Sequence, residues 1–163
     1  MIPADVNIDD LARQLAEDGV AIGETGDVYP SMEGELQDVL QQAAGSEFGR
    51  AGIAILDDTP ARSADQRDIA QDLLNAVDLD TVIVRSPGSG AIVSDIHSRA
   101  DIETAQWRFL ADSDYVTATR NLAEQVTATD TNWVAVTALM LAAVAVAVVV
   151  TALSVRRSTT VPT

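Results

Sequence analysis

The chain has 163 residues, a net charge of −15 and no cysteine. A chain without cysteine cannot form disulfides, zinc-thiolate sites or a thiol nucleophile. All 25 acidic residues and eight of the ten arginines precede residue 131, so residues 1–130 carry a charge of −17 and the tail carries +2. A domain this acidic repels nucleic acid and anionic lipid headgroups, and it favours cations or a basic partner.

The first part of the chain alternates between helical patterns and irregular stretches. Apolar residues at helical spacing predict a helix over Ile8–Asp18, with Asn7 as its N-terminal cap. The apolar residues 19–23 are expected to be extended, and residues 24–31 irregular. A second helix is predicted over Met32–Ala44.

A strand–helix–strand pattern follows. The apolar run Gly52–Leu56 predicts a buried strand, and Ser63–Gln66 has the spacing of a capping box that opens a third helix. Its inward face is expected to be Ile69, Leu73, Leu74 and Val77. The next strand is predicted over Asp80–Arg85, and the turn residues Ser86–Gly90 join it to a strand at Ala91–Ser94. A right-handed crossover would make the first two strands parallel, and the hairpin adds an antiparallel neighbour.

The last part of the N-terminal region is helical in pattern from about Ala100 to Ala128, with a break expected near Asp112–Asp114. Three aromatic residues of this region are predicted to contribute to partner binding, namely Trp107, Phe109 and Tyr115. We expect Trp107 and Phe109 to be exposed, although some of the apolar residues here must pack on the sheet.

A membrane span is predicted from Trp133 and Val134 to Val155, because no charge interrupts these 23 residues. At helical rise they extend about 34 Å, enough to cross a hydrocarbon core of about 30 Å. The basic residues Arg156 and Arg157 place the C-terminus in the cytoplasm by the positive-inside rule. The start of the chain does not resemble a signal peptide, so we expect this helix to be the export signal as well.

These elements predict an α/β fold class, a small sandwich of a mixed sheet with packed helices, followed by one C-terminal transmembrane helix. The expected domains are an acidic α/β domain at 1–130, the transmembrane helix at 133–155 and a short basic cytoplasmic tail at 156–163. The expected location is the cell membrane, with the N-terminal domain outside the cytoplasm.

Few residues suggest catalytic chemistry. His97 has Ser94 and Asp95 nearby, but no nucleophile elbow is present, so we interpret it as a surface or loop-end histidine. The acidic pairs Asp57/Asp58, Asp78/Asp80 and Asp112/Asp114 fit solvated turn residues better than a metal site. The glycine-containing turn after Arg85 lacks the ending of a phosphate-binding loop. We therefore expect no catalytic residue, no metal ligand set and no cofactor.

The segments GIAIL, SADQRDIAQDLLNAV, DTVIVRS and PGSGAIVSD resemble the core of a TPM domain. The whole chain is similar to small corynebacterial and mycobacterial single-pass membrane proteins with a TPM-like extracytoplasmic domain. This resemblance implies a link to RipA-type peptidoglycan endopeptidases of cell separation. It predicts a membrane-anchored interaction module that binds and regulates a cell-wall hydrolase, without enzymatic activity of its own. The alternatives are a TPM-type metal-dependent phosphatase and an accessory subunit of a membrane complex.

Overall fold

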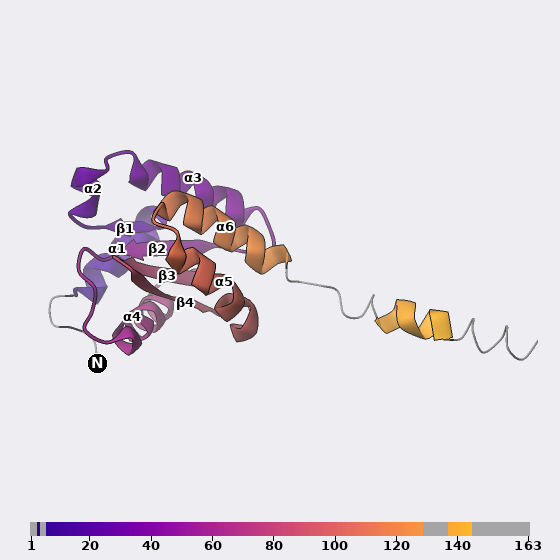
Figure 1. The fold of residues 1–163 in the computed structure, drawn as a ribbon. Helices are drawn as coiled ribbons and strands as arrows, with labels where there is room; N and C mark the ends of the chain where they lie inside the picture. Colours follow the sequence, from indigo (N-terminus) through magenta and orange to yellow (C-terminus); the bar gives the residue numbers. More distant parts are fainter. Residues whose placement is uncertain (1–2, 4–5, 129–136, 145–163) are drawn as a thin grey trace, which may run out of the picture. The chain divides into compact units, whose positions relative to one another are not determined.

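The computed structural model of the protein describes residues 3, 6–128 and 137–144. The chain divides into two compact units, Met1–Thr129 and Asp130–Thr163, which we describe separately. The first unit is a four-stranded sheet with helices packed on both faces (Figure 1). This is the mixed α/β class that the sequence predicts.

The helices and strands of the first unit follow one another along the chain as α1 (Ile8–Asp18), β1 (Val20–Ile22), α2 (Thr25–Val28), α3 (Met32–Ala44), β2 (Ala51–Ile55), α4 (Ser63–Ala76), β3 (Thr81–Ser86), β4 (Ser89–Ser94), α5 (Arg99–Ala111) and α6 (Tyr115–Ala128). The sheet order is β1-β2-β3-β4. The parallel pairing of β2 with β3 and the antiparallel hairpin of β3 with β4 are as expected. The structure adds β1, which pairs parallel to β2.

Alternating side chains of the strands form two cores, because neighbouring residues of a strand point to opposite faces. On one face Ile53, Ile83 and Ile92 pack with α3, α5 and α6. On the other face Ala54 and Val82 pack with α1 and α4. Since both faces are covered, every residue of β2 and β3 is buried. This explains why apolar residues run without alternation through β2 and through Val82–Val84 of β3.

The two crossover connections have opposite hands. Both step in the same direction across the sheet, from β1 to β2 and from β2 to β3. However, α3 lies on one face of the sheet and α4 on the other. Only one of the two connections can therefore be right-handed, the hand that most such units adopt. As a result, the chain leaves the carboxyl ends of β1 and β2 toward opposite faces.

Local signals correctly mark several element ends. The Asn7 side chain accepts a hydrogen bond from the Asp10 N–H at 3.1 Å and so caps α1. Gly19 ends this helix in the left-handed region, at φ 86°. In the β3–β4 hairpin the turn is Pro87-Gly88, and Gly88 supplies the positive φ, at 71°.

Two predicted features differ in the structure. Residues 24–31 are not wholly irregular, because they contain the short helix α2. The capping box at Ser63–Gln66 does not form. Arg62 is the N-terminal cap of α4 and makes no side-chain cap bond. The Gln66 side chain is instead buried, where it donates to Ser86 Oγ and accepts from Ser89 Oγ, both at 2.6 Å. It thereby ties α4 to the hairpin.

In the second unit, residues 137–144 form a helix whose large apolar side chains, Leu139, Met140, Leu141 and Val144, are all exposed. Among the residues that the structure describes, no helix is both long and apolar enough to cross a membrane. Most of the predicted span lies outside the described residues, including Trp133, Val134 and Val155. The predicted topology residues Arg156 and Arg157 also lie outside them.

The first unit has its own two cores, which leads to a first prediction. A fragment that ends at Ala128 is expected to be soluble and folded in buffer without detergent, because its apolar side chains pack on the sheet from both faces. Circular dichroism and a cooperative thermal transition would check this. An insoluble or non-cooperative fragment would show that the domain needs the rest of the chain.

Candidate functional site: an aromatic groove at the carboxyl edge of the sheet

A cavity of about 720 Å³ lies at the carboxyl end of β3. Four segments form it: the start of α2, the residues before and at the start of α3, the end of β3 with its turn, and residues 110–115 between α5 and α6. Both tyrosines of the chain, Tyr29 and Tyr115, line it together with Met32, Pro87 and Leu110. We call this cavity the aromatic groove. Tyrosine, methionine and arginine are the residue types that protein interfaces favour.

Arg85 forms the floor of the aromatic groove and is only 2% exposed. Its guanidinium donates to the carbonyl oxygens of Phe109, of Leu110 at 3.3 Å and of Asp112 at 2.6 Å, which end helix α5. It also lies 4.7 Å from the Phe109 ring centre and 4.8 Å from that of Tyr115. A cation at a helix C-terminus stabilises the carbonyls there, so Arg85 fixes the α5–α6 junction to the sheet.

Burial lowers the pKa of Arg85 from its ordinary value, and nearby Tyr115 and Asp112 partly oppose this effect. A guanidinium nevertheless stays charged at neutral pH. Its Nε is buried and has no hydrogen-bond partner among the described residues. The guanidinium of Arg85 has lost its hydration on burial. Its bonds to the carbonyls and its contacts with the two aromatic rings therefore offset the cost of that desolvation.

Two carboxylates form the rim of the groove at the break between α5 and α6. The Asp114 carboxylate accepts from the N–H groups of Val116 and Thr117 at 3.0 and 3.1 Å, and from Thr117 Oγ1 at 2.9 Å. These bonds, led by those from Thr117, lower the pKa of Asp114, so it is ionised at neutral pH. The Asp112 side chain accepts from the Asp114 N–H at 3.0 Å. The expected helix break is thus confirmed, and it carries negative charge.

The three aromatic residues predicted to bind a partner have different positions. Trp107 is 62% exposed, with the Arg108 guanidinium 5.2 Å from its ring centre. It precedes Leu110 and Ala111 by one helical turn, so it lies on the side of α5 that leads into the groove. Tyr115 is half-buried and lines the groove. Phe109 is 2% exposed, so the prediction that it is exposed is wrong: it packs in the core.

Another ligand position common in α/β folds is partly occupied by a side chain of the protein itself. Ligands often bind where adjacent parallel strands send their chains to opposite faces, here at the ends of β1 and β2. The carboxylate of Asp57 occupies this point and accepts from the N–H groups of Glu24 and Thr25, at 3.0 and 2.8 Å. A side chain at Gly23 would clash, because its Cβ would lie 2.2 Å from Asp57 Oδ2. Asp57 therefore fixes the start of α2, and it also lines a smaller cavity of about 310 Å³ at this point, together with Ile22, Gly23 and Ile55.

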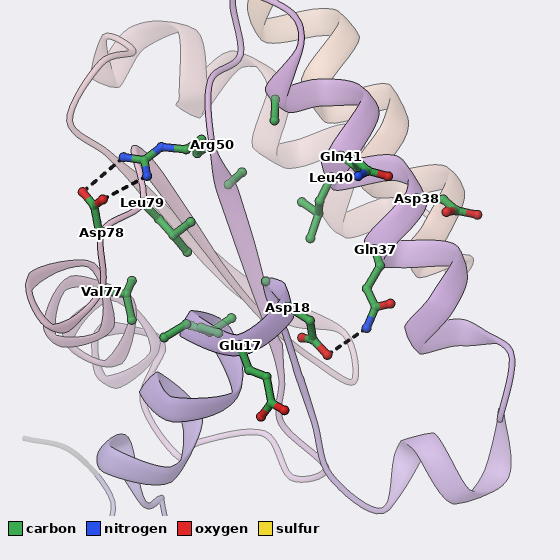
Figure 2. A pocket seen from close by; sticks show the side chains of 15 residues that line it. Glu17, Asp18, Gln37, Asp38, Leu40, Gln41, Arg50, Val77, Asp78 and Leu79 are labelled. Carbon is green, nitrogen blue, oxygen red and sulfur yellow. Dashed lines mark hydrogen bonds and ion pairs between the residues drawn. The ribbon is translucent and has the colours of Figure 1, made fainter.

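A second cavity, of about 610 Å³, lies at the opposite, amino edge of the sheet (Figure 2). Three of its charged groups, Asp18, Arg50 and Asp78, bond to other groups of the lining. Arg50 binds both carboxylate oxygens of Asp78, at 3.0 and 3.1 Å, and Gln37 donates to Asp18 at 2.9 Å. The lining contains no aromatic residue. Because aromatic side chains are the usual anchors of interfaces, the aromatic groove fits protein binding better than this acidic cleft.

The remaining candidates have structural roles. The His97 ring stacks on Phe48 at 5.3 Å between ring centres, and its Nε2 lies 3.0 Å from the Phe48 carbonyl oxygen. Ser94 Oγ accepts from the backbone N–H of His97 and not from its ring. Asp80 accepts from the Arg50 N–H at 2.7 Å. The acidic pairs are thus not merely solvated, since Asp57, Asp78, Asp80, Asp112 and Asp114 all take part in defined hydrogen bonds. Within the described ranges, no three acidic or histidine side chains are placed to hold a metal ion.

Comparison with known proteins gives one family and one similar fold. A family model described as "Membrane protein Rv1476" matches residues 1–162. The solution NMR structure of the N-terminal domain of the cg2496 protein from Corynebacterium glutamicum is similar, with a TM-score of 0.55 and 18% identity. The match covers 80% of this chain and 88% of that one. At this identity the likeness shows the fold alone. No curated protein matches the chain.

Proposed function

The chain belongs to the membrane protein Rv1476 family, and from this premise we propose that it is a membrane-anchored module that binds another protein outside the cytoplasm. The observation that carries the proposal is the aromatic groove, which both tyrosines of the chain line. The exposed Trp107 lies one helical turn before its lining residues Leu110 and Ala111. The exposed apolar side chains of residues 137–144 support an anchor in the second unit, since apolar surface of this kind is stable in contact with lipid.

The proposed partner is a peptidoglycan hydrolase of the RipA type, which the chain would regulate during cell separation. This choice rests on the resemblance of residues 52–95 to a TPM domain and of the whole chain to small actinobacterial membrane proteins. The charge of −17 on residues 1–130 supports a partner with a basic surface, because opposite charges accelerate encounter. Association should slow as salt rises, while dissociation changes less, since exposed charges are screened beyond about 8 Å at physiological ionic strength.

The topology can be tested with reporters at the two ends of the chain. A reporter that is active only outside the cytoplasm is expected to work at the N-terminus and to fail after Thr163. The reason is that Arg156 and Arg157 follow an uncharged apolar stretch. The opposite pattern would contradict both the orientation and a cell-wall partner.

Partner binding can be tested with the full chain in detergent and a purified RipA-type endopeptidase. Trp107→Ala is expected to weaken capture of the enzyme by about 10-fold or more, as loss of an aromatic anchor does. The control is Ile96→Ala. Ile96 is 52% exposed but lies beyond the end of β4, at the amino edge of the sheet, away from the groove. Equal capture by both variants and the unchanged protein would place the contact elsewhere, and no capture at all would reject this partner.

A further inference from the structure

The geometry of the aromatic groove limits how a partner can bind there. It lies at the end of β3, and β3 is hydrogen-bonded to β2 on one side and to β4 on the other. A bound segment therefore cannot join the sheet at this strand, as in β-strand addition. The lining comes from turns and helix ends, namely Tyr29 after α2, the Pro87-Gly88 turn and residues 110–115. Such a lining suits a short extended segment better than a long helix.

The apolar side chains of the groove favour a segment that binds without main-chain pairing. Tyr29 is 57% exposed, and Tyr115, Met32 and Leu110 are half-buried, so their outer surfaces are open to contact. A polyproline II helix makes no internal hydrogen bonds and is already ordered before it binds. Proline rings pack on tyrosines, and grooves lined with aromatic residues recognise proline-rich segments in this way.

The charges at the rim of the groove favour a bound segment that has a basic residue beside its prolines. Asp112 and Asp114 form its rim, and Asp114 is held in its ionised form by the bonds from Val116 and Thr117. The positive charge of Arg85 is buried at the floor and is directed to the carbonyls that end α5. The rim is therefore negative, and it belongs to a domain of charge −17. An acidic segment would be repelled, while arginine or lysine would be attracted.

We propose that the aromatic groove binds a proline-rich segment of the partner protein in the polyproline II conformation. Prolines of the segment pack on Tyr29 and Tyr115, and an adjacent arginine or lysine pairs with the carboxylates of Asp112 and Asp114. This inference rests on the proposed function, because it specifies the chemistry of the segment that the module recognises. It does not depend on which hydrolase carries that segment.

The test measures binding of fluorescent peptides to the full chain in detergent by fluorescence anisotropy. One peptide is proline-rich with a flanking arginine, a second has alanine in place of every proline, and a third has glutamate in place of the arginine. The first is expected to bind at least about 10-fold more tightly than the other two, as loss of an anchoring contact predicts. Equal binding of the first two peptides, or tighter binding of the alanine peptide as a helix, would overturn the proposal.

Variants of the protein connect this binding to the groove. Tyr29→Ala should abolish the preference for the proline-rich peptide, while Tyr29→Phe retains it, because the ring provides the contact. Asp114→Asn should weaken binding of the arginine peptide and reduce its salt dependence, with an unchanged melting temperature, since asparagine also caps a helix. The matched control is Val28→Ala, at an exposed neighbour that does not line the groove. If Tyr29→Ala and Val28→Ala bind the peptide equally, the segment does not bind here.

The two proposals fail in different ways. If the proline-rich peptide does not bind, but capture of the endopeptidase still depends on Trp107, then the module binds its partner through a segment of other chemistry. In that case the protein-binding function stands and the polyproline inference is rejected. If the peptide binds and the endopeptidase is not captured, the groove has the proposed specificity and the choice of partner is wrong.

Discussion

Phe109→Ala is expected to lower the free energy of unfolding by about 3–5 kcal/mol, the usual cost of removing a buried phenylalanine ring. Phe109 packs in the core between the sheet and α5–α6, and its ring also contacts the guanidinium of Arg85. Alanine would leave a cavity and remove this cation–π contact. At about 3 °C per kcal/mol for a domain of this size, the melting temperature should fall by roughly 10 °C or more.

The matched control is Trp107→Ala, two residues earlier on the same helix. Trp107 is mostly exposed, so its removal should change stability by no more than about 0.5 kcal/mol. Thermal unfolding of both variants, followed by circular dichroism, checks the contrast. If Trp107→Ala melts as low as Phe109→Ala, then Trp107 belongs to the core, and its effect on partner capture could not be assigned to a direct contact.

Arg85→Met is expected to destabilise the domain by about 2–4 kcal/mol, because it leaves the carbonyls of Phe109, Leu110 and Asp112 without their donor. Methionine matches the apolar stem of arginine but donates no hydrogen bond. The gain from no longer burying a charge opposes this loss. We expect the loss of the hydrogen bonds to dominate, because the three carbonyl groups stay in place and a buried polar group without a partner is costly.

Arg85→Lys distinguishes charge from geometry at the same position. Lysine keeps the positive charge but lacks the planar fork that reaches several carbonyls and stacks on Phe109 and Tyr115. The melting temperature of Arg85→Lys should therefore lie between those of Arg85→Met and of the unchanged protein. Both variants should also weaken partner capture, because the α5–α6 junction that Arg85 holds forms one wall of the groove. A methionine variant as stable as the unchanged protein would show that burying the charge costs as much as its hydrogen bonds contribute.

The sequence by itself determined the elements that depend on short-range signals. Asn7 and Gly19 mark the ends of α1 correctly, since cap bonds and positive φ are local properties. The apolar runs of β2 and β3 and the helix between them predicted the parallel pair, and Pro87-Gly88 predicted the hairpin. The uncharged stretch from residue 133 predicted a membrane span, in agreement with a family of membrane proteins, although most of that span lies outside the described residues.

Only the tertiary structure decided which side chains are exposed and which meet. Helix α5 carries apolar residues on several sides, so its pattern could not separate the exposed Trp107 from the buried Phe109. Tyr29 is the one aromatic residue of residues 24–31, and it lines the same cavity as Tyr115 only because α2 and the α5–α6 junction meet at the carboxyl edge of the sheet. Arg85 is the penultimate residue of β3, and its acceptors lie more than twenty residues later in the chain. Burial and long-range hydrogen bonds depend on how elements pack, and local spacing does not encode that packing.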